Sequence, residues 1–301
     1  MPPADQTWTT RRLLAWMHQA FEARELDSPR LMAELLLSHV IGCDRLRLYM
    51  DTDRPASPLE RQTLRELVAR ALNNEPVQYL VGQAYFFGIP FKVAPGVLIP
   101  RPSTETIIDH VLHHARARHT SDADTILIAD VCTGSGAIAL ALLKNLTAGR
   151  AIASDLSPQA IAIAADNAKR LELADRVDFV EGDLLDPVRA HPAVRPGSLR
   201  YLVSNPPYIP DGEWDAVEPN VRDHEPEIAL RASPDGLTFV RPILEQGPEL
   251  LEPGGLILVE IAAATADHAR AIAESNKLLE GVRILDDGDG LPRVVVGRRR
   301  N

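Results

Sequence analysis

The tetrapeptide Asn205-Pro206-Pro207-Tyr208 combines residue types that can bind a planar nitrogen group. The Asn side-chain oxygen and the carbonyl beside it can accept both hydrogens of an –NH2 group, while the Tyr ring lies against its π system. The tetrapeptide follows the apolar run Tyr201-Leu202-Val203, which predicts a short buried strand that the two prolines end. We therefore expect the tetrapeptide at the carboxyl edge of a sheet, where open α/β folds bind ligands.

A second candidate site is the segment Val131-Cys132-Thr133-Gly134-Ser135-Gly136, between an apolar run and a predicted helix. Glycines at a strand-to-helix turn let a ligand approach the backbone beside free helical N–H groups. Gly134-x-Gly136-x-x-Ala139 also fits the dinucleotide fingerprint, so NAD is an alternative ligand. Asp130 at the strand end favours a different ligand, because a carboxylate attracts the ammonium of a methionine moiety and repels a pyrophosphate.

Two further predicted strands end in acidic residues. Asp155 lies about 20 positions beyond the glycine segment, where such a residue typically binds ribose hydroxyls. Capping of the helix that begins at Ser157-Pro158 is an equally good interpretation of Asp155. The next strand ends at Asp183-Leu184, which places Asp183 to meet an adenine amino group and Leu184 to meet the ring. Taken alone, Asp183 would be typical of a turn.

Apolar segments that predict strands alternate with helical segments after Arg101. The strand candidates cover residues 125–130, 150–154, 177–181, 200–204, 254–261, 282–286 and 292–297. This alternation predicts a parallel sheet with helices on both faces. The last candidate leaves no room for a preceding helix, so we expect it to return as an antiparallel partner.

The first hundred residues have a different pattern. Residues 1–75 carry periodic apolar positions, and Ser57-Pro58 followed by Glu60 is typical of a helix start. Residues 76–100 are aromatic and interrupted by glycines, which predicts a β-hairpin linker with strands near 78–82 and 85–93. We expect a helical domain at 1–75, the linker at 76–100 and an α/β domain at 101–301.

Composition narrows the classes of partner. The 301-residue chain has a net charge of −10, of which residues 1–75 contribute −1, from ten Arg against eleven Asp or Glu. A duplex-binding enzyme is expected to carry a basic stripe, and the only dense basic cluster is Arg298-Arg299-Arg300, which we interpret as a solvated tail. We therefore expect no direct nucleic-acid binding. The acidic net charge is compatible with a basic protein partner.

The positions of cysteine, histidine and apolar residues indicate whether the chain has disulfides, a metal site or a membrane segment. The two cysteines, Cys43 and Cys132, lie far apart, and His110, His113 and His114 have no accompanying Cys or matched carboxylate. We expect neither a disulfide framework nor a metal site. A signal segment and an apolar run of about 18 residues are both missing, so we expect a soluble, cytoplasmic protein without membrane association.

The order of these strand ends resembles S-adenosylmethionine-dependent methyltransferases of the seven-stranded class. Within that class, Asn-Pro-Pro-Tyr marks enzymes that methylate adenine N6, cytosine N4 or a glutamine amide. Other segments resemble the peptide-chain release factor glutamine N5-methyltransferases, the HemK/PrmC family. These segments are Ala33–Leu37, Arg45–Tyr49, Glu75–Gly82, Leu98–Glu105, Glu225-Pro226-x-x-Ala229-Leu230, Asp235-Gly236-Leu237 and Gly254–Ile261.

The resemblance implies a seven-stranded Rossmann-like domain that uses S-adenosyl-L-methionine, preceded by a helical substrate-recognition domain. It implies as substrate the glutamine of the Gly-Gly-Gln loop of peptide-chain release factors, and we expect a monomer. The implied cofactor-binding residues are Asp130, Cys132, Thr133, Gly134, Ser135, Gly136, Asp155, Asp183, Leu184 and Asn205. Catalysis is implied for Asn205, Pro206 and Tyr208, with Pro207 joining them in binding the substrate.

Three positions depart from the family pattern. Cys132 stands where Gly is usual, although Cys is small enough for the loop to keep its expected conformation. Leu184 stands where Trp or Phe is frequent, which weakens the expected packing on adenine. The residues after Glu260-Ile261 are Ala262–Ala264, where a Gly and a later Gln are usual.

Four alternatives remain. A related family modifies a glutamine of a large-subunit ribosomal protein, although Ile99–Glu105 favours release factors. A DNA adenine-N6 methyltransferase needs a basic target-recognition region, for which the roughly 25 residues after Tyr208 are too few. A NAD-dependent dehydrogenase leaves Asn-Pro-Pro-Tyr unexplained. A non-catalytic adaptor would be expected to lose Asn205 or the glycine segment, and both are present.

Overall fold

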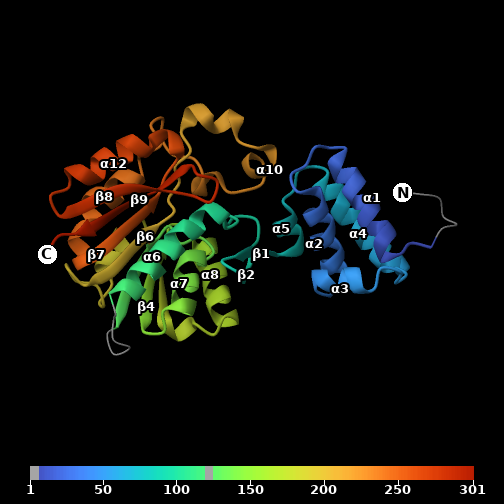
Figure 1. Cartoon of the computed structure of the whole chain (residues 1–301), viewed down its shortest axis with the longest axis horizontal. Coiled ribbons are helices and arrows are strands. Elements are labelled where there is room, and N and C mark those ends of the chain that lie inside the picture. The colour runs from blue at the N-terminus through green and yellow to red at the C-terminus, as the bar shows by residue number, and fades with distance from the viewer. Residues whose placement is uncertain (1–6, 119–124) are drawn as a thin grey trace. The chain divides into compact units, whose positions relative to one another are not determined.

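The computed structural model describes residues 7–118 and 125–301. The chain divides into two compact units, which are described separately below. The helical unit comprises Met1–Gln83 with Glu218–His224, and the α/β unit comprises Ala84–Val217 with Glu225–Asn301 (Figure 1). Among the described residues, no helix is long and apolar enough to cross a membrane.

The helical unit packs short amphipathic helices around one apolar core. Its helices are α1 (Thr10–Glu22), α2 (Pro29–Ile41), α3 (Arg45–Met50), α4 (Pro58–Ala71), α5 (Val77–Val81) and α10 (Pro219–Arg222). Leu36 and Leu37 of α2 pack in that core with Leu64 of α4. The predicted helix start is confirmed as a capping box, because Ser57 Oγ accepts from Glu60 N and Glu60 Oε2 accepts from Ser57 N.

The strand predicted near residues 78–82 is wrong, because this segment is helix α5. Pro76 stands at its N-cap and Gly82 ends it, and this arrangement of Pro and Gly is typical of helix termini. Val77 and Leu80 point into the helical core, and this burial outweighs the strand propensity of the segment. The predicted linker, residues 76–100, does contain a hairpin, but its strands are β1 (Gln83–Phe86) and β2 (Ile89–Lys92), so the turn falls inside the second predicted strand.

The turn of this hairpin is tight. Phe87 and Gly88 both have positive φ, 50° and 72°, as a two-residue type I′ turn requires. The Phe87 N–H donates to Glu105 Oε1 over 2.6 Å, which fastens the hairpin to α6 (Glu105–Ala117) within the α/β unit.

The α/β unit contains the predicted seven-stranded sheet. Its strands are β3 (Ile126–Val131), β4 (Gly149–Asp155), β5 (Val177–Glu181), β6 (Leu199–Ser204), β7 (Leu251–Glu260), β8 (Leu279–Asp286) and β9 (Pro292–Arg299). The strand order is β5-β4-β3-β6-β7-β9-β8, and the first five are parallel. The expected return of the last segment is confirmed, because β9 pairs antiparallel with both β7 and β8.

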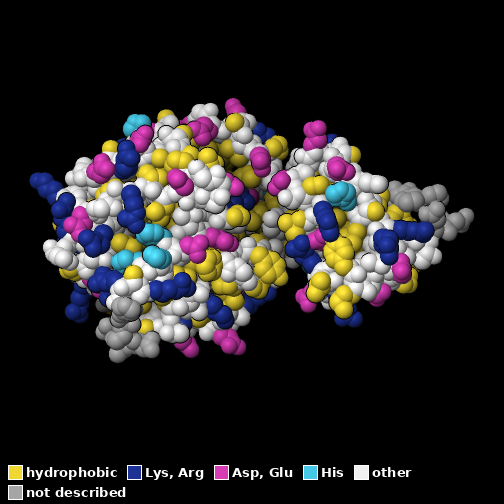
Figure 2. Space-filling view, in the orientation of Figure 1, with side chains coloured by type: hydrophobic (Ala, Val, Ile, Leu, Met, Phe, Trp, Pro, Cys, Tyr) yellow, Lys and Arg dark blue, Asp and Glu magenta, His cyan; other side chains and the backbone are white. Residues whose placement is uncertain are grey.

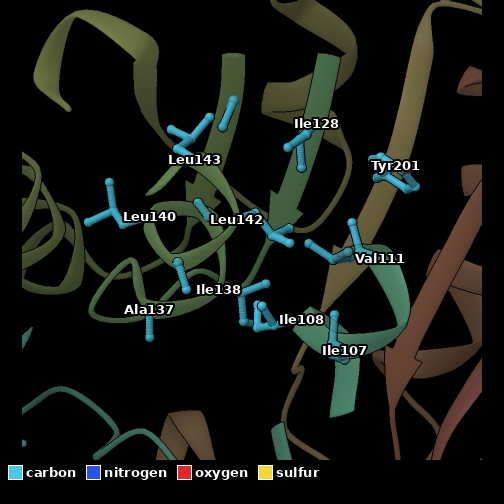
Figure 3. Close-up of a cluster of buried hydrophobic side chains, with 14 of the residues drawn as sticks. Ile107, Ile108, Val111, Ile128, Ala137, Ile138, Leu140, Leu142, Leu143 and Tyr201 are labelled. Atoms are coloured by element: carbon cyan, nitrogen blue, oxygen red, sulfur yellow. The ribbon is translucent and has the colours of Figure 1, made fainter. Parts of the chain in front are cut away.

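Helices cover both faces of this sheet. One face carries α6, α7 (Ala137–Asn145) and α8 (Pro158–Arg170), and the other carries α9 (Asp186–Ala190), α11 (Val240–Gln246) and α12 (Ala266–Ser275). Figure 3 shows the core of the first face, where Ile108 and Val111 of α6 lie beside Ile138 of α7 and Tyr201 of β6. These contacts hold the amino ends of α6 and α7 against the sheet.

The direction of the connections changes between β3 and β6. From β3 the chain proceeds outward through β4 and β5, and it then returns to place β6 on the other side of β3. Ligands of open α/β sheets bind outside the carboxyl ends of the strands at such a switch point. The segments after Val131 and after Ser204 therefore lie on either side of the predicted crevice.

Charged side chains of both signs are mixed on the face of the α/β unit seen in Figure 2. Several form ion pairs, such as Arg270 with Asp267 at 3.0 Å. The interpretation of the C-terminal arginines as a solvated tail is wrong for Arg298 and Arg299, which belong to β9. Arg298 pairs with Glu280 of β8 at 2.5 Å, because the β8–β9 ladder continues beyond the apolar part of both strands.

Candidate active site

A pocket at the switch point gathers most of the residues predicted to bind the cofactor. It holds about 1000 Å³ of empty space, part of which is open solvent. All of its lining residues belong to the α/β unit. The predicted residues among them are Cys132, Thr133, Gly134, Ser135, Asp155, Asp183, Leu184, Asn205 and Pro207. Asp130, Gly136, Pro206 and Tyr208 lie next to this lining in the chain.

The loop after β3 owes its conformation to residues with left-handed backbone angles. Cys132 has φ 61°, Gly134 has φ 57° and Gly136 has φ 80°, so three of five consecutive residues are left-handed. A Cβ on Gly136 would lie 3.1 Å from atoms of Leu140 and Ala164, which requires glycine where α7 begins. At Cys132 a left-handed backbone explains the usual glycine of the family, and the loop forms with cysteine at a cost in strain. Burial raises the pKa of the Cys132 thiol.

Asp130 is fully buried below this loop. Its Oδ2 accepts from Thr133 Oγ1 at 2.6 Å and from Ala139 N at 3.1 Å, whereas Oδ1 is buried without a hydrogen-bond partner. Desolvation raises the pKa of Asp130 to about 7, against the lowering effect of those two hydrogen bonds. A buried carboxylate oxygen without a partner suits a cationic ligand group, such as an ammonium.

Asp155 is held by two backbone N–H groups, although it is not the N-cap of α8. Its Oδ2 accepts from Gly134 N at 2.8 Å, and its Oδ1 accepts from Ser157 N at 2.9 Å at the start of α8. Ser157 is the N-cap itself, because its hydroxyl accepts from Ala160 N. The Asp155 carboxylate also lines the pocket, where each oxygen retains a lone pair for a ribose hydroxyl. Burial raises its pKa.

Asp183 and Leu184 form the wall of the pocket beyond β5. Leu184 has φ 44°, and its carbonyl accepts from Ser154 Oγ at 3.2 Å, so its backbone is fixed independently of its side chain. Gly182 has no room for a side chain, because a Cβ there would lie 3.1 Å from Pro187. Leu156 and Ala160 complete this apolar end of the pocket. An aromatic ring such as adenine fits between such surfaces.

The Asn205 side chain is oriented by a network that the sequence analysis did not predict. Asn205 Nδ2 donates to Thr104 Oγ1 at 3.1 Å, and Thr104 Oγ1 donates to Glu260 Oε2 at 2.6 Å. Tyr208 Oη donates to the other oxygen, Glu260 Oε1, at 2.9 Å. Glu260 is fully buried at the end of β7, and desolvation raises its pKa. Because the –NH2 group of Asn205 is bonded to Thr104, its amide oxygen is the group left to accept from an –NH2 ligand.

Another buried carboxylate, Glu225, joins two segments beside the pocket. Glu225 accepts from Ile99 N at 3.0 Å and forms an ion pair with Arg101. This tie joins the irregular segment before α6 to the chain around Pro226 and Ile228, which lines the pocket. Two such partners give this carboxylate a role in holding the chain together.

Two of the three histidines of α6 have separate partners. His114 Nδ1 lies 3.0 Å from Tyr201 Oη, and His110 Nε2 lies 3.1 Å from an Arg283 nitrogen. Burial lowers the pKa of His114 to about 4. Within residues 7–118 and 125–301, no group of three or more His, Cys, Asp or Glu side chains could hold a metal ion.

Comparisons with known proteins agree with this geometry. The profile of the PrmC N-terminal domain matches residues 12–82, and the profile of a methyltransferase domain matches residues 128–221. A release factor glutamine methyltransferase of Chlorobaculum tepidum is 38% identical over 291 residues, which cover 97% of each chain. The chain belongs to the release factor glutamine methyltransferase family.

Another member of this family, from Geobacter sulfurreducens, is 38% identical over 300 residues, which cover 99% of each chain. The solved structure of a release factor-specific protein-(glutamine-N5) methyltransferase from Alicyclobacillus acidocaldarius is 27% identical, with a TM-score of 0.41. That match covers 70% of this chain and all of the other.

Membership of the release factor glutamine methyltransferase family confirms the predicted fold class and the predicted class of enzyme, an S-adenosylmethionine-dependent methyltransferase. The residues of the pocket fit that cofactor. On the pocket wall, Asp155 suits the ribose and the Asp183–Leu184 segment suits the adenine. Asp130 is buried outside this lining, and its unpartnered Oδ1 suits the ammonium. The dinucleotide alternative fits less well, because Asp130 and Asp155 would both lie near a pyrophosphate.

Proposed function

We propose that this protein methylates the side-chain nitrogen, N5, of the glutamine in the Gly-Gly-Gln loop of peptide-chain release factors. The observation that carries the proposal is the position of Asn205 on the same pocket as Thr133–Ser135, Asp155 and Asp183. In this arrangement, Thr133–Ser135, Asp155 and Asp183 hold the methyl donor, and Asn205 holds the amide nitrogen in the same pocket. The names and near-complete coverage of the relatives support the same substrate.

A glutamine amide nitrogen is a weak nucleophile, because its lone pair is delocalised into the carbonyl. In this proposal, Asn205 Oδ1 and the Pro206 carbonyl accept its two hydrogens and direct the lone pair along one line, while Tyr208 packs on the amide plane. These acceptors also stabilise the positive charge that develops on nitrogen.

Bound S-adenosylmethionine supplies an electrophilic methyl group on a sulfonium. The nitrogen lone pair would form the new N–C bond as the S–C bond breaks, and the electron pair of the S–C bond would remain on sulfur. One N–H proton becomes acidic as the methyl group arrives and then leaves to solvent. A general base is therefore not required before the transition state.

The cofactor assignment uses the pocket residues in order. Asp130 Oδ1 accepts the methionine ammonium, the backbone of residues 132–136 approaches the methionine moiety, and Asp155 binds the ribose hydroxyls. Asp183 accepts from the adenine amino group, and Leu184 packs on the ring. The shape of the loop supports this order, because its left-handed residues bring the backbone of Gly134 to Asp155.

The proposal gives residues 1–75 the task of recognising the folded release factor. Leu46, Tyr49 and Met50 of α3 are exposed apolar side chains, with 73%, 44% and 79% of their surface accessible. Hydrophobic side chains are visible on the surface of the helical unit in Figure 2. Such surface on a soluble protein is typical of an interaction site, and remote binding can help to position the reacting amide.

Three further parts of the proposal concern assembly, nucleic acid and compartment. We propose that the monomer is active, because the pocket is lined entirely by residues of the α/β unit. The net charge of −10 supports a protein substrate without direct nucleic-acid contact. We propose that the enzyme works in the cytoplasm, the compartment of its substrate.

The test is mass spectrometry of a purified release factor after incubation with this protein and isotope-labelled S-adenosylmethionine. We expect one added methyl group, on the glutamine of the Gly-Gly-Gln loop. A label on a large-subunit ribosomal protein, with none on release factors, would assign the enzyme to the alternative substrate. A label on adenine in DNA would contradict the proposal.

Ligand-induced thermal stabilisation separates the remaining alternatives. We expect S-adenosylhomocysteine to raise the melting temperature and NAD to leave it unchanged, because only a ligand of the native state stabilises it. Stabilisation by NAD alone would indicate a dehydrogenase. Stabilisation by S-adenosylhomocysteine without turnover on any of the three substrates would indicate an adaptor.

A further inference from the structure

Thr104, Asn205, Tyr208 and Glu260 come from three separated parts of the chain and meet in one hydrogen-bonded network. Thr104 lies in the turn before α6, Asn205 and Tyr208 follow β6, and Glu260 ends β7. Thr104 and Glu260 are both buried, and Thr104 lines the pocket beside Asn205. The mechanism above uses Asn205 and Tyr208 but gives no task to the other two.

We propose that Glu260 is a positioning residue that acts through the Thr104 hydroxyl to fix the Asn205 side chain with its oxygen towards the substrate amide. The inference rests on the proposed function and deepens it, because it states what makes Asn205 an acceptor rather than a donor. An Asn side chain has one face that accepts and one that donates, and rotation by 180° exchanges them.

The Thr104 hydroxyl has a single proton, and this fixes the orientation of the Asn205 amide. Thr104 Oγ1 has one proton, and its 2.6 Å separation from Glu260 Oε2 is typical of a hydroxyl that donates to a carboxylate. With that proton committed, Oγ1 can only accept from its other neighbour. The group of Asn205 that lies 3.1 Å away must then be the –NH2 group, and the carbonyl oxygen is turned to the other side.

Tyr208 is fixed by the same carboxylate. Its hydroxyl donates to Glu260 Oε1 at 2.9 Å, so each carboxylate oxygen accepts one hydroxyl proton. One buried group therefore sets both the amide of Asn205 and the ring of Tyr208. A proton on Glu260 would remove one acceptor and free the Thr104 hydroxyl to donate towards Asn205.

Charged groups on every side of Glu260 determine where it titrates. Burial raises its pKa, while the Thr104 and Tyr208 hydroxyls and the positive charges of Arg293 and Arg101 lower it. Arg293 of β9 is itself paired with Asp287 at 3.0 Å, and Arg101 with Glu225. The net direction is upward, so the protonated form appears at a higher pH than for an ordinary glutamate. We call the chain of hydrogen bonds from Glu260 through Thr104 to Asn205 the relay. The relay predicts that kcat falls as Glu260 takes up its proton.

The principal test replaces Thr104 by valine, which keeps the shape and removes the hydroxyl. At saturating cofactor and release factor, we expect Thr104→Val to lower kcat by about 10²-fold, the loss typical of a misplaced reacting group. The dissociation constant for S-adenosylhomocysteine should stay the same. The decline of kcat at low pH that depends on Glu260 should disappear, because the link to Asn205 is cut.

Three further variants serve as controls. Thr104→Ser keeps the hydroxyl and should recover most of the activity. Thr265→Val removes another buried threonine hydroxyl, one that bonds only to the Ala262 carbonyl, and should leave kcat unchanged at a similar melting temperature. Glu260→Gln should lower kcat and remove the same pH dependence, because its –NH2 group opposes one of the two hydroxyl donors.

The outcomes separate the relay from the function on which it rests. Wild-type protein that adds no methyl group to release factor glutamine would overturn the proposed function. Active wild type with a nearly normal kcat in folded Thr104→Val would overturn the relay alone. A lower kcat that retains the full pH dependence, or that Thr104→Ser fails to restore, would show that Thr104 contributes only packing.

Discussion

The two halves of the pocket hold their ligands by different means. At the ends of β3, β4 and β5, the shape comes from left-handed backbone at Cys132 and Leu184 and from a carboxylate, Asp155, that is bound to backbone N–H groups. At the ends of β6 and β7, it comes from side chains that bind one another, from Asn205 through Thr104 to Glu260. The first half should tolerate changes of side chain that the second cannot.

The two fully buried carboxylates show the same contrast. Glu260 has a hydroxyl donor on each oxygen, whereas Asp130 has both of its donors on Oδ2 and none on Oδ1. A satisfied carboxylate holds its neighbours in place, and an unsatisfied one favours a cationic ligand. Under the proposed function, Glu260 would orient the groups that bind the substrate amide, and Asp130 would bind the cofactor.

The largest effect is expected for Asn205→Ala, which removes the acceptor of the amide-reading half. Loss of one preorganised hydrogen-bonding group costs about 10²–10³-fold in kcat, and we expect at least that loss here. Cofactor affinity should change little, because its contacts come mainly from the other half. Steady-state kinetics and calorimetric titration with S-adenosylhomocysteine measure the two quantities. Near-normal turnover would mean that another group orients the substrate amide.

Asp130→Asn should give the reverse pattern, with a weaker cofactor complex and a nearly unchanged kcat at saturation. A hydrogen bond to a charged group contributes about 1.5–3 kcal/mol, so we expect roughly a tenfold or greater loss of affinity. In the wild type, affinity should rise with pH through about 7, where Asp130 ionises. Titration calorimetry between pH 5.5 and 8.5 checks this, and an equal slope in the variant would exclude Asp130 as its source.

The same substitution should change how the stability of the ligand-free protein depends on pH. The pKa of Asp130 is higher in the folded state than in the unfolded state, so its contribution is complete at low pH and is lost as pH rises through about 7. The loss amounts to roughly 2–4 kcal/mol for an upward shift of about three units. Between pH 5 and 8, the free energy of unfolding of wild type should fall relative to that of Asp130→Asn.

Sequence patterns were sufficient to locate the sheet and most of the pocket. Sequence patterns marked all seven strands, and those of β3 and β6 were the clearest apolar runs, because strands buried on both faces are continuously apolar. The 132–136 loop and Asn205 follow these two runs. The pattern failed at residues 78–82, where packing against the helical core decided the conformation. It failed again at Arg298 and Arg299, where strand pairing continues into charged residues.

Such patterns could not predict the relay from Glu260 through Thr104 to Asn205. Thr104 and Glu260 are separated by 156 residues, and no local rule links a threonine in a turn to a glutamate at a distant strand end. The one available signal was Glu260 itself, a charged residue at the end of the apolar run Leu256–Val259. A buried charge in that position needs partners, although only the fold shows which ones.

A change outside both halves should affect recognition alone. The double variant Leu46→Glu/Met50→Glu places charge on the exposed apolar face of α3, and we expect kcat/KM for intact release factor to fall about tenfold. Activity on a short Gly-Gly-Gln peptide should stay the same. Leu59→Glu on α4 is the matched control, since Leu59 is 72% exposed but lies on another helix. Equal losses on protein and peptide would instead indicate damage to the fold.

The smallest effect is expected at Cys132, in the half that depends on backbone. The left-handed conformation costs a non-glycine residue roughly 1–2 kcal/mol, and Cys132→Gly would relieve it. Glycine also adds about 0.4–1 kcal/mol of conformational freedom to the unfolded chain, so the two terms largely cancel. We expect the free energy of unfolding to rise by less than about 1 kcal/mol, with kcat and cofactor affinity unchanged. Denaturant titration measures the first quantity.

Cys132→Val is the contrasting variant, because a β-branched side chain is a steric outlier at positive φ. It should lower both stability and cofactor affinity, although valine is as apolar as the buried thiol. Tolerance of glycine together with intolerance of valine would show that the position is selected by its backbone angle. A large loss of activity in Cys132→Gly would instead give the sulfur a direct part in binding the methyl donor, and the contrast between the two halves would then be wrong at this residue.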